Sequence, residues 1–135
     1  MITAKGTYPD LALLIDGEWL GAGGRETLPV ENPATRTIAG RLPLAGIEDL
    51  DRALDAAARS FPSWSATSPH ERAAILSRGA ALLRERSEHF AFSMTVENGK
   101  PINESRGEVS FTADIIEFLA AEAIRTYGTV VPTSA

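Results

Sequence analysis

Two histidines and a series of glutamates are candidate catalytic side chains in this chain, and the sequence contains no cysteine. Without a thiol there is no disulfide framework, no cysteine-based metal site and no sulfur nucleophile. His70 and His89 fit no metal-ligand spacing and form no triad with serine and aspartate. We therefore interpret both histidines as structural, with His70 exposed in the first turn of a helix, and predict no catalytic residue.

Glutamates are frequent in the last two predicted helices. They are Glu97, Glu104, Glu108, Glu117 and Glu122. Glu104 and Glu108 lie four residues apart, so they share one face of a helix and repel each other mildly. A glycosidase-like pair instead needs two acids that face each other across a cleft. We interpret the glutamates as a solvated face, with Glu122 and Arg125 forming a surface ion pair.

The glycine-rich segment Gly21-Ala22-Gly23-Gly24 invites comparison with a phosphate-binding loop. A dinucleotide fingerprint requires a strand before the glycines, a helix after them and an acidic residue about 20 positions further on. Extended sequence follows the glycines here. We therefore interpret the segment as a linker and predict no cofactor-binding residue.

The composition excludes several classes of function. The chain has 135 residues, 44% of them hydrophobic, which is enough for a packed core of one domain or part of one. Its net charge is −5 and its basic residues are scattered, so nucleic-acid binding is not expected. Its apolar runs are far shorter than the ~20 residues that span a bilayer. With no secretory leader visible, we expect a cytoplasmic protein without membrane contact.

The first third of the chain is predicted to be extended. Residues 1–12 are interpreted as a flexible arm. Asp16-Gly17 lies between two apolar runs and predicts a hairpin with a two-residue type I′ turn over 13–20. Two further extended segments, 26–30 and 37–42, are separated by a turn at Asn32-Pro33.

The rest of the chain has helical periodicity. Apolar residues recur on one helical face from Leu50 to Phe61, and Pro62 is expected to end this helix. Ser68 and Glu71 form a capping box that starts a second helix.

Two more helices are expected after the second. Ser87 is a candidate cap for a third helix, which Gly99 terminates. The last helix is expected to run from about Ile102 to Tyr127, followed by Gly128 as the residue just beyond its end. Trp19 and Trp64 are interpreted as packing residues.

These elements predict an α+β fold that is mostly α. A short antiparallel β region over 13–45 precedes about four helices over 47–128. Two or three strands alone make a marginal sheet, and the outer faces of the helices need something to pack on. The predicted fold is therefore incomplete in itself.

Five short segments occur in a fixed order along the chain. They are Leu14–Trp19, Val30–Thr35, Ala57–Trp64, Glu71–Leu76 and Glu97–Pro101. Together they resemble the N-terminal part of the NAD(P)-dependent aldehyde dehydrogenases, over about residues 13–132. Residues 106–109 and 127–128 are most similar to the succinate-semialdehyde dehydrogenase branch. One departure is visible: Arg36 stands where the family usually has glycine, which puts the geometry of that turn in question.

The resemblance implies that residues 13–135 are an incomplete N-terminal portion of a cofactor-binding domain within a larger α/β fold. The cysteine that attacks the aldehyde, the glutamate that activates water, the oxyanion-binding asparagine and the dinucleotide-binding segments come later in the family. None has a matching position here. NAD or NADP is thus expected for the full-length parent and no cofactor for this stretch, which we expect to be inactive alone.

The resemblance also implies a candidate site for a monovalent cation. Some family members bind such an ion near the Asn-Pro turn and the end of the helix before the Gly-Lys-Pro segment. The matching positions are the backbone carbonyls of Val30 and Glu31 and the side chain of Glu97. A cation site needs several oxygen ligands, and these positions supply oxygen.

Two kinds of partner are expected. Faces that a full-length parent would bury predict contact with the remainder of such a chain, or self-association into an oligomer. The alternative is a stand-alone helical protein-interaction module, or a degenerate remnant of such an enzyme. The coding sequence beyond Ala135 would distinguish these possibilities, because a downstream cysteine-bearing segment favours a fragment.

Overall fold

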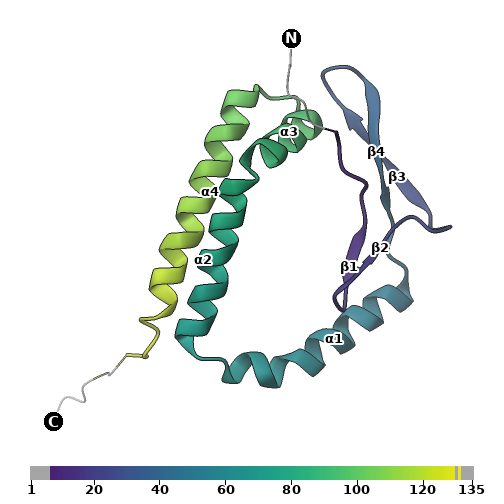
Figure 1. The fold of residues 1–135 in the computed structure, drawn as a ribbon. Coiled ribbons are helices and arrows are strands. Elements are labelled where there is room, and N and C mark those ends of the chain that lie inside the picture. Colours follow the sequence, from purple (N-terminus) through teal and green to yellow (C-terminus); the bar gives the residue numbers. More distant parts are fainter. Residues whose placement is uncertain (1–6, 130, 132–135) are drawn as a thin grey trace.

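The computed structural model describes residues 7–129 and 131, in which two small antiparallel sheets precede four helices (Figure 1). The first sheet pairs β1 (Leu13–Ile15) with β2 (Glu18–Leu20). The turn between them has positive φ at Asp16 (53°) and Gly17 (78°). A type I′ turn requires positive φ at both central residues, so the predicted hairpin is confirmed.

The second sheet pairs β3 (Thr27–Asn32) with β4 (Thr37–Pro43). The Asn32 side-chain oxygen accepts a hydrogen bond from the Ala34 amide at 3.0 Å, which folds the chain back. Arg36 then adopts a φ of 61°. The turn geometry is thus the one that glycine favours, although arginine occupies the position.

Helix α1 (Ile47–Ala66) does not end where expected, because it continues through Pro62. A proline inside a helix removes one backbone hydrogen bond but does not forbid the helical conformation on an exposed face. Past the proline, the hydroxyls of Ser63 and Ser65 donate to helix carbonyls at 3.0 Å. Trp64, on the added turn, lines an open hollow together with residues of the second and fourth helices.

Helix α2 (Pro69–Glu85) starts as predicted. The Ser68 hydroxyl accepts from the Glu71 amide, and the Glu71 carboxylate accepts from the Ser68 amide. Helix α3 (Ser87–Asn98) ends at Gly99, which has a φ of 77°. Its N-cap, however, is Arg86 without a side-chain cap bond, so the prediction that Ser87 caps it is wrong.

Helix α4 (Ile102–Ala123) ends four residues before the predicted end. The Arg125 amide already bonds the Glu122 carbonyl in a tighter turn, and Tyr127 is 82% exposed. A helix end without packing partners has little to hold it beyond its own hydrogen bonds. Gly128 does adopt positive φ (81°), but as part of the coil that follows.

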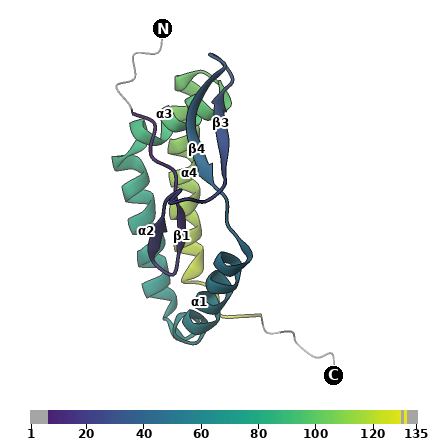
Figure 2. The ribbon, with the colours of Figure 1, turned by 90° about the vertical axis from the view of Figure 1, so that its right-hand side faces the viewer.

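Helices α2 and α4 lie side by side along most of their length, and α3 joins them at one end (Figures 1 and 2). Small residues fill the space between the three helices. The fully or nearly buried ones are Ala73, Ala80, Ala91, Val109, Ala113 and Ala120. The hydroxyls of Thr95 and Ser105 satisfy each other at 2.8 Å inside this core.

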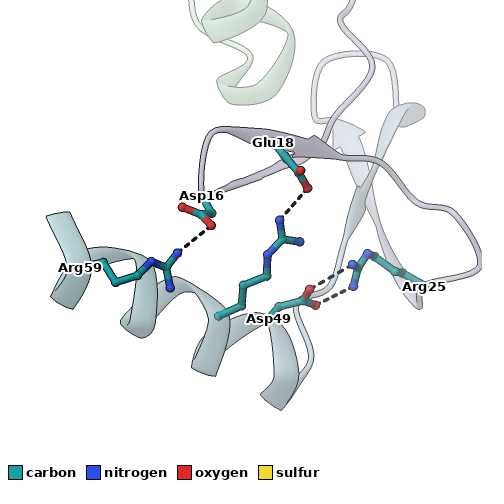
Figure 3. Close-up of polar contacts among 6 residues, drawn as sticks. Asp16, Glu18, Arg25, Asp49 and Arg59 are labelled. Atoms are coloured by element: carbon teal, nitrogen blue, oxygen red, sulfur yellow. Dashed lines mark hydrogen bonds and ion pairs between the residues drawn. The ribbon is translucent and has the colours of Figure 1, made fainter.

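Ion pairs link the first hairpin to α1 (Figure 3). Arg59 reaches Asp16 at 2.8 Å, and Arg52 reaches Glu18 at 2.6 Å. Arg25 makes a two-pronged contact with Asp49 in the first turn of α1, at 2.6 and 3.0 Å. The hairpin therefore lies over the polar side of α1, and the apolar stripe of the helix remains exposed.

Large apolar side chains stay exposed over much of the molecule. Trp19 is 72% exposed and Trp64 48%, so neither is packed to the extent predicted within this chain. In the described residues, no helix is long and apolar enough to cross a membrane.

Candidate functional site

Glu97 lies in the last turn of α3 and is held by a residue from the start of the chain. The Tyr8 hydroxyl donates a hydrogen bond to Oε1 of Glu97 at 2.6 Å. Within the described part of the chain, Oε1 is the only oxygen of this carboxylate with a hydrogen-bond partner. The second oxygen, Oε2, is therefore available to another ligand.

Val30 and Glu31 lie where the β3–β4 ladder is irregular. Val30 pairs with Gly40 and Glu31 pairs with Ile38, so Ala39 is an extra residue and the register shifts between the two candidate positions. Such a bulge disrupts the regular pattern of backbone hydrogen bonds. The residue left without a partner, Ala39, lies on β4, opposite the step between the two candidate positions.

Two close approaches bring these segments together. A Cβ added to Gly99, at the end of α3, would lie 2.9 Å from Cγ of Pro33. A Cβ added to Gly40, the partner of Val30, would lie 2.7 Å from the ring of Tyr8. Helix α3 also contacts β3 directly. The structure therefore places the three predicted positions in one neighbourhood.

Among the acidic side chains of this neighbourhood, Glu97 is the one whose carboxylate is not held in an ion pair by the residues that the structure describes. Burial, followed by the hydrogen bond and the charge of Glu97, raises the pKa of Tyr8 to about 12, so the phenol stays protonated and donates. Arg36 Nε lies 2.8 Å from the Glu31 carboxylate and occupies it. Lys100, three residues after Glu97, pairs with Glu108 at 2.5 Å instead.

The donor set suits a hard cation. It consists of a carboxylate and backbone carbonyls, which are the oxygen ligands preferred by such ions. A single open negative charge matches a single positive charge. The described residues contain no group of three or more histidine, cysteine, aspartate or glutamate side chains arranged for a metal ion. Any further ligands at this site would be water or other oxygens.

The other candidate residues do not converge. His70 and His89 are both exposed, on different helices. Glu117 pairs with Arg84, and Glu122 pairs with Arg125. These groups lie on solvated helix faces, where ion pairs contribute little.

Sequence reasoning missed Tyr8, which it assigned to an arm. One signal was available, because Gly40 interrupts a predicted strand. A glycine inside a strand often marks a close approach by another part of the chain. It did not indicate which residue would approach.

A separate open hollow of about 430 Å³ lies where α1, α2 and α4 meet. Its lining residues are Trp64, Arg72, Ile75, Leu76, Ala123 and Thr126. The Nε atom of Arg72 is buried without a hydrogen-bond partner in the described residues.

Comparison with known proteins gives consistent matches. The aldehyde dehydrogenase family model matches residues 19–135. The chain is 42% identical over 119 residues to the succinate-semialdehyde dehydrogenase [NADP(+)] GabD of Escherichia coli (strain K12), covering 88% of this chain and 25% of the relative. It is also 42% identical over 118 residues to a glutarate-semialdehyde dehydrogenase of Pseudomonas putida, with coverages of 87% and 25%.

Solved structures match as well. An aldehyde dehydrogenase from Brucella melitensis superposes with a TM-score of 0.87 at 34% identity, over 100% of this chain and 28% of that one. PnpE, solved in complex with nicotinamide adenine dinucleotide, gives a TM-score of 0.85 at 34% identity, over 94% and 26%. The chain thus spans about a quarter of the length of the relatives it matches.

Proposed function

The chain belongs to the aldehyde dehydrogenase family, and from this premise we propose that it forms the N-terminal part of an NAD(P)-dependent enzyme that oxidises a semialdehyde to its carboxylate. The observation that carries this proposal is the match over residues 19–135, joined to superposition on whole dehydrogenases. The semialdehyde preference is supported by the succinate- and glutarate-semialdehyde dehydrogenases among the relatives. Residues 13–135 would form part of the cofactor-binding domain.

The chemistry of the reaction assigns this stretch a supporting role. Oxidation through a covalent intermediate requires a thiolate, and these 135 residues contain no cysteine. Hydride transfer requires a bound nicotinamide, which NAD or NADP would supply in the whole enzyme. The stretch supplies packing surface and one candidate ion site. By itself it is expected neither to turn over an aldehyde nor to need a cofactor.

We propose that the carbonyls of Val30 and Glu31 and the carboxylate of Glu97 bind a monovalent cation. The ion would join the end of α3 to the bulge of the β3–β4 hairpin, which come from distant parts of the sequence. Its role would be structural, because these groups are not arranged to act on a substrate.

The exposed faces of the helices support a proposal about partners. The outer side of α4 presents Phe111 and Phe118, exposed by 65% and 64%. The apolar stripe of α1 presents Leu54 and Phe61, exposed by 60% and 67%. We propose that the remainder of a dehydrogenase chain covers these faces, and that self-association occurs where it is absent. Nothing favours an unrelated interaction module over this.

The test is an assay of a whole protein carrying this segment. With succinate or glutarate semialdehyde and either NAD⁺ or NADP⁺, absorbance of the reduced nicotinamide should rise. The 135-residue chain assayed in parallel should give no rise. Turnover by the short chain alone would contradict the proposal, as would a whole protein inactive with every aldehyde tried. A cytoplasmic location belongs to the same proposal and is checked by cell fractionation.

A further inference from the structure

We infer that Tyr8 is a positioning residue that sets the Glu97 carboxylate for the cation site, an inference that rests on the proposed site. The hydroxyl of Tyr8 lies 2.6 Å from Oε1 of Glu97, although 89 positions separate the two residues in sequence. A contact between residues so far apart in sequence forms only when the chain adopts its tertiary fold.

The ring of Tyr8 joins the two halves of the site. It lies so close to Gly40 that a Cβ there would be 2.7 Å from Cε1 and 3.1 Å from Cδ1 of the ring. Gly40 is the cross-strand partner of Val30. One side chain therefore contacts the strand opposite one proposed ligand and hydrogen-bonds another proposed ligand directly.

The hydrogen bond restricts a side chain that would otherwise be mobile. Glu97 is exposed and has no ion pair within the described residues. A glutamate in that situation loses rotamer freedom when it binds an ion. The Tyr8 hydroxyl fixes Oε1 beforehand and leaves Oε2 open. Partners that orient a metal ligand in this way are worth about 10–100-fold in affinity.

The opposite role, in which Tyr8 competes with the cation, is less consistent with the chemistry. The phenol is a neutral donor that uses one of two carboxylate oxygens. It adds no positive charge that would repel an ion, and it needs no displacement before Oε2 is used. Competition would make removal of the hydroxyl tighten cation binding, whereas positioning would make it weaken binding.

The experiment measures thermal unfolding of the chain in increasing KCl, against tetramethylammonium chloride at equal ionic strength. The original chain should show a shift specific to potassium. Tyr8→Phe, which keeps the ring and removes the hydroxyl, should need about 10–100-fold more potassium for the same shift. Tyr127→Phe is the matched control, because Tyr127 is 82% exposed and should leave the shift unchanged.

A second variant tests the position of the ring without removing the hydroxyl. Gly40→Ala would place a methyl group where the Tyr8 ring lies and should weaken the potassium effect as Tyr8→Phe does. If the original chain shows no potassium-specific shift, the proposed site fails and the role of Tyr8 fails with it. If the original chain and Tyr8→Phe respond equally, or Tyr8→Phe binds more tightly, only the role of Tyr8 is overturned.

Discussion

Arg36 adopts a left-handed backbone conformation, which is unfavourable in free energy for any residue other than glycine. Its φ of 61° closes the turn between β3 and β4, and its guanidinium pairs with Glu31 at 2.8 Å. The pair is largely exposed, so it returns little of that cost. We predict that Arg36→Gly stabilises the chain by about 1 kcal/mol, measured as the free energy of unfolding in urea.

The matched control is Arg41→Gly in the same hairpin. Arg41 lies in β4 and is not among the residues with positive φ. Glycine in a strand interior lowers stability, because the unfolded chain gains freedom and no side chain packs. Arg41→Gly should therefore destabilise the chain. Two arginine substitutions with the same sign of effect would contradict the strain at position 36.

Asp49 makes the free energy of unfolding depend on pH. The amide of Gly46 donates to its carboxylate at 2.9 Å, and Arg25 contributes two further bonds. The backbone hydrogen bond first, and then Arg25, hold the pKa of Asp49 below its usual value. A carboxyl whose folded pKa lies below its unfolded pKa adds stability above the unfolded value and loses it as pH falls through the folded value.

Asp49→Asn should accordingly destabilise the chain at neutral pH and make little difference once the pH is below the folded pKa of Asp49. Urea unfolding at neutral and acidic pH measures both. Asp51→Asn is the control. It removes a negative charge two residues further along α1, from a side chain that does not bond Arg25 or Gly46. A penalty for Asp49→Asn that persists in acid would assign the effect to packing.

At the scale of elements, the start of α2 depends on a reciprocal pair of bonds. The Ser68 hydroxyl accepts from the Glu71 amide at 3.2 Å, and the Glu71 carboxylate accepts from the Ser68 amide at 3.1 Å. Ser68→Ala should cost about 1 kcal/mol in the free energy of unfolding. Ser77→Ala, at an exposed interior position of the same helix, should be neutral or slightly stabilising. Equal losses from both would argue against the cap.

The elements that could be predicted from sequence are those fixed by local chemistry. The Asp16-Gly17 turn, the Ser68 cap and the end of α3 at Gly99 each follow from a few adjacent residues. Two predicted helix ends were wrong, because a single residue such as Pro62 or Tyr127 does not by itself decide where a helix stops. Helix α1 passes through Pro62, and α4 ends at Ala123 where packing runs out.

Some residues of the candidate cation site could be predicted from the sequence and others could not. Val30, Glu31 and Glu97 came from family resemblance, and the structure places them in one neighbourhood. Tyr8 could not be found from sequence, because its contact with Glu97 bridges 89 positions and no local pattern encodes it. The bulge at Val30 was equally invisible, since it depends on how β4 pairs.

On the scale of the whole molecule, the chain exposes more surface than its size requires. Its accessible area is 9988 Å², against roughly 6,800 Å² expected for a compact monomer of 14.4 kDa. The excess is larger than the roughly 1,000–2,500 Å² that each partner contributes to an obligate interface, since such interfaces bury about 2,000–5,000 Å² over both partners. Its core consists mostly of alanines, whereas its phenylalanines lie largely outside. These proportions support the proposal that the remainder of a dehydrogenase chain covers the exposed faces.

We therefore predict that the isolated chain self-associates, with an apparent mass by light scattering that rises with concentration. Replacing Phe111 and Phe118 with serine removes the largest apolar side chains from the outer face of α4 and should lower that mass. Thr112→Ser, an exposed position on the same helix, is the control and should leave it unchanged. A chain that stays monomeric at all concentrations, with a sharp cooperative melt, would show that these faces need no cover.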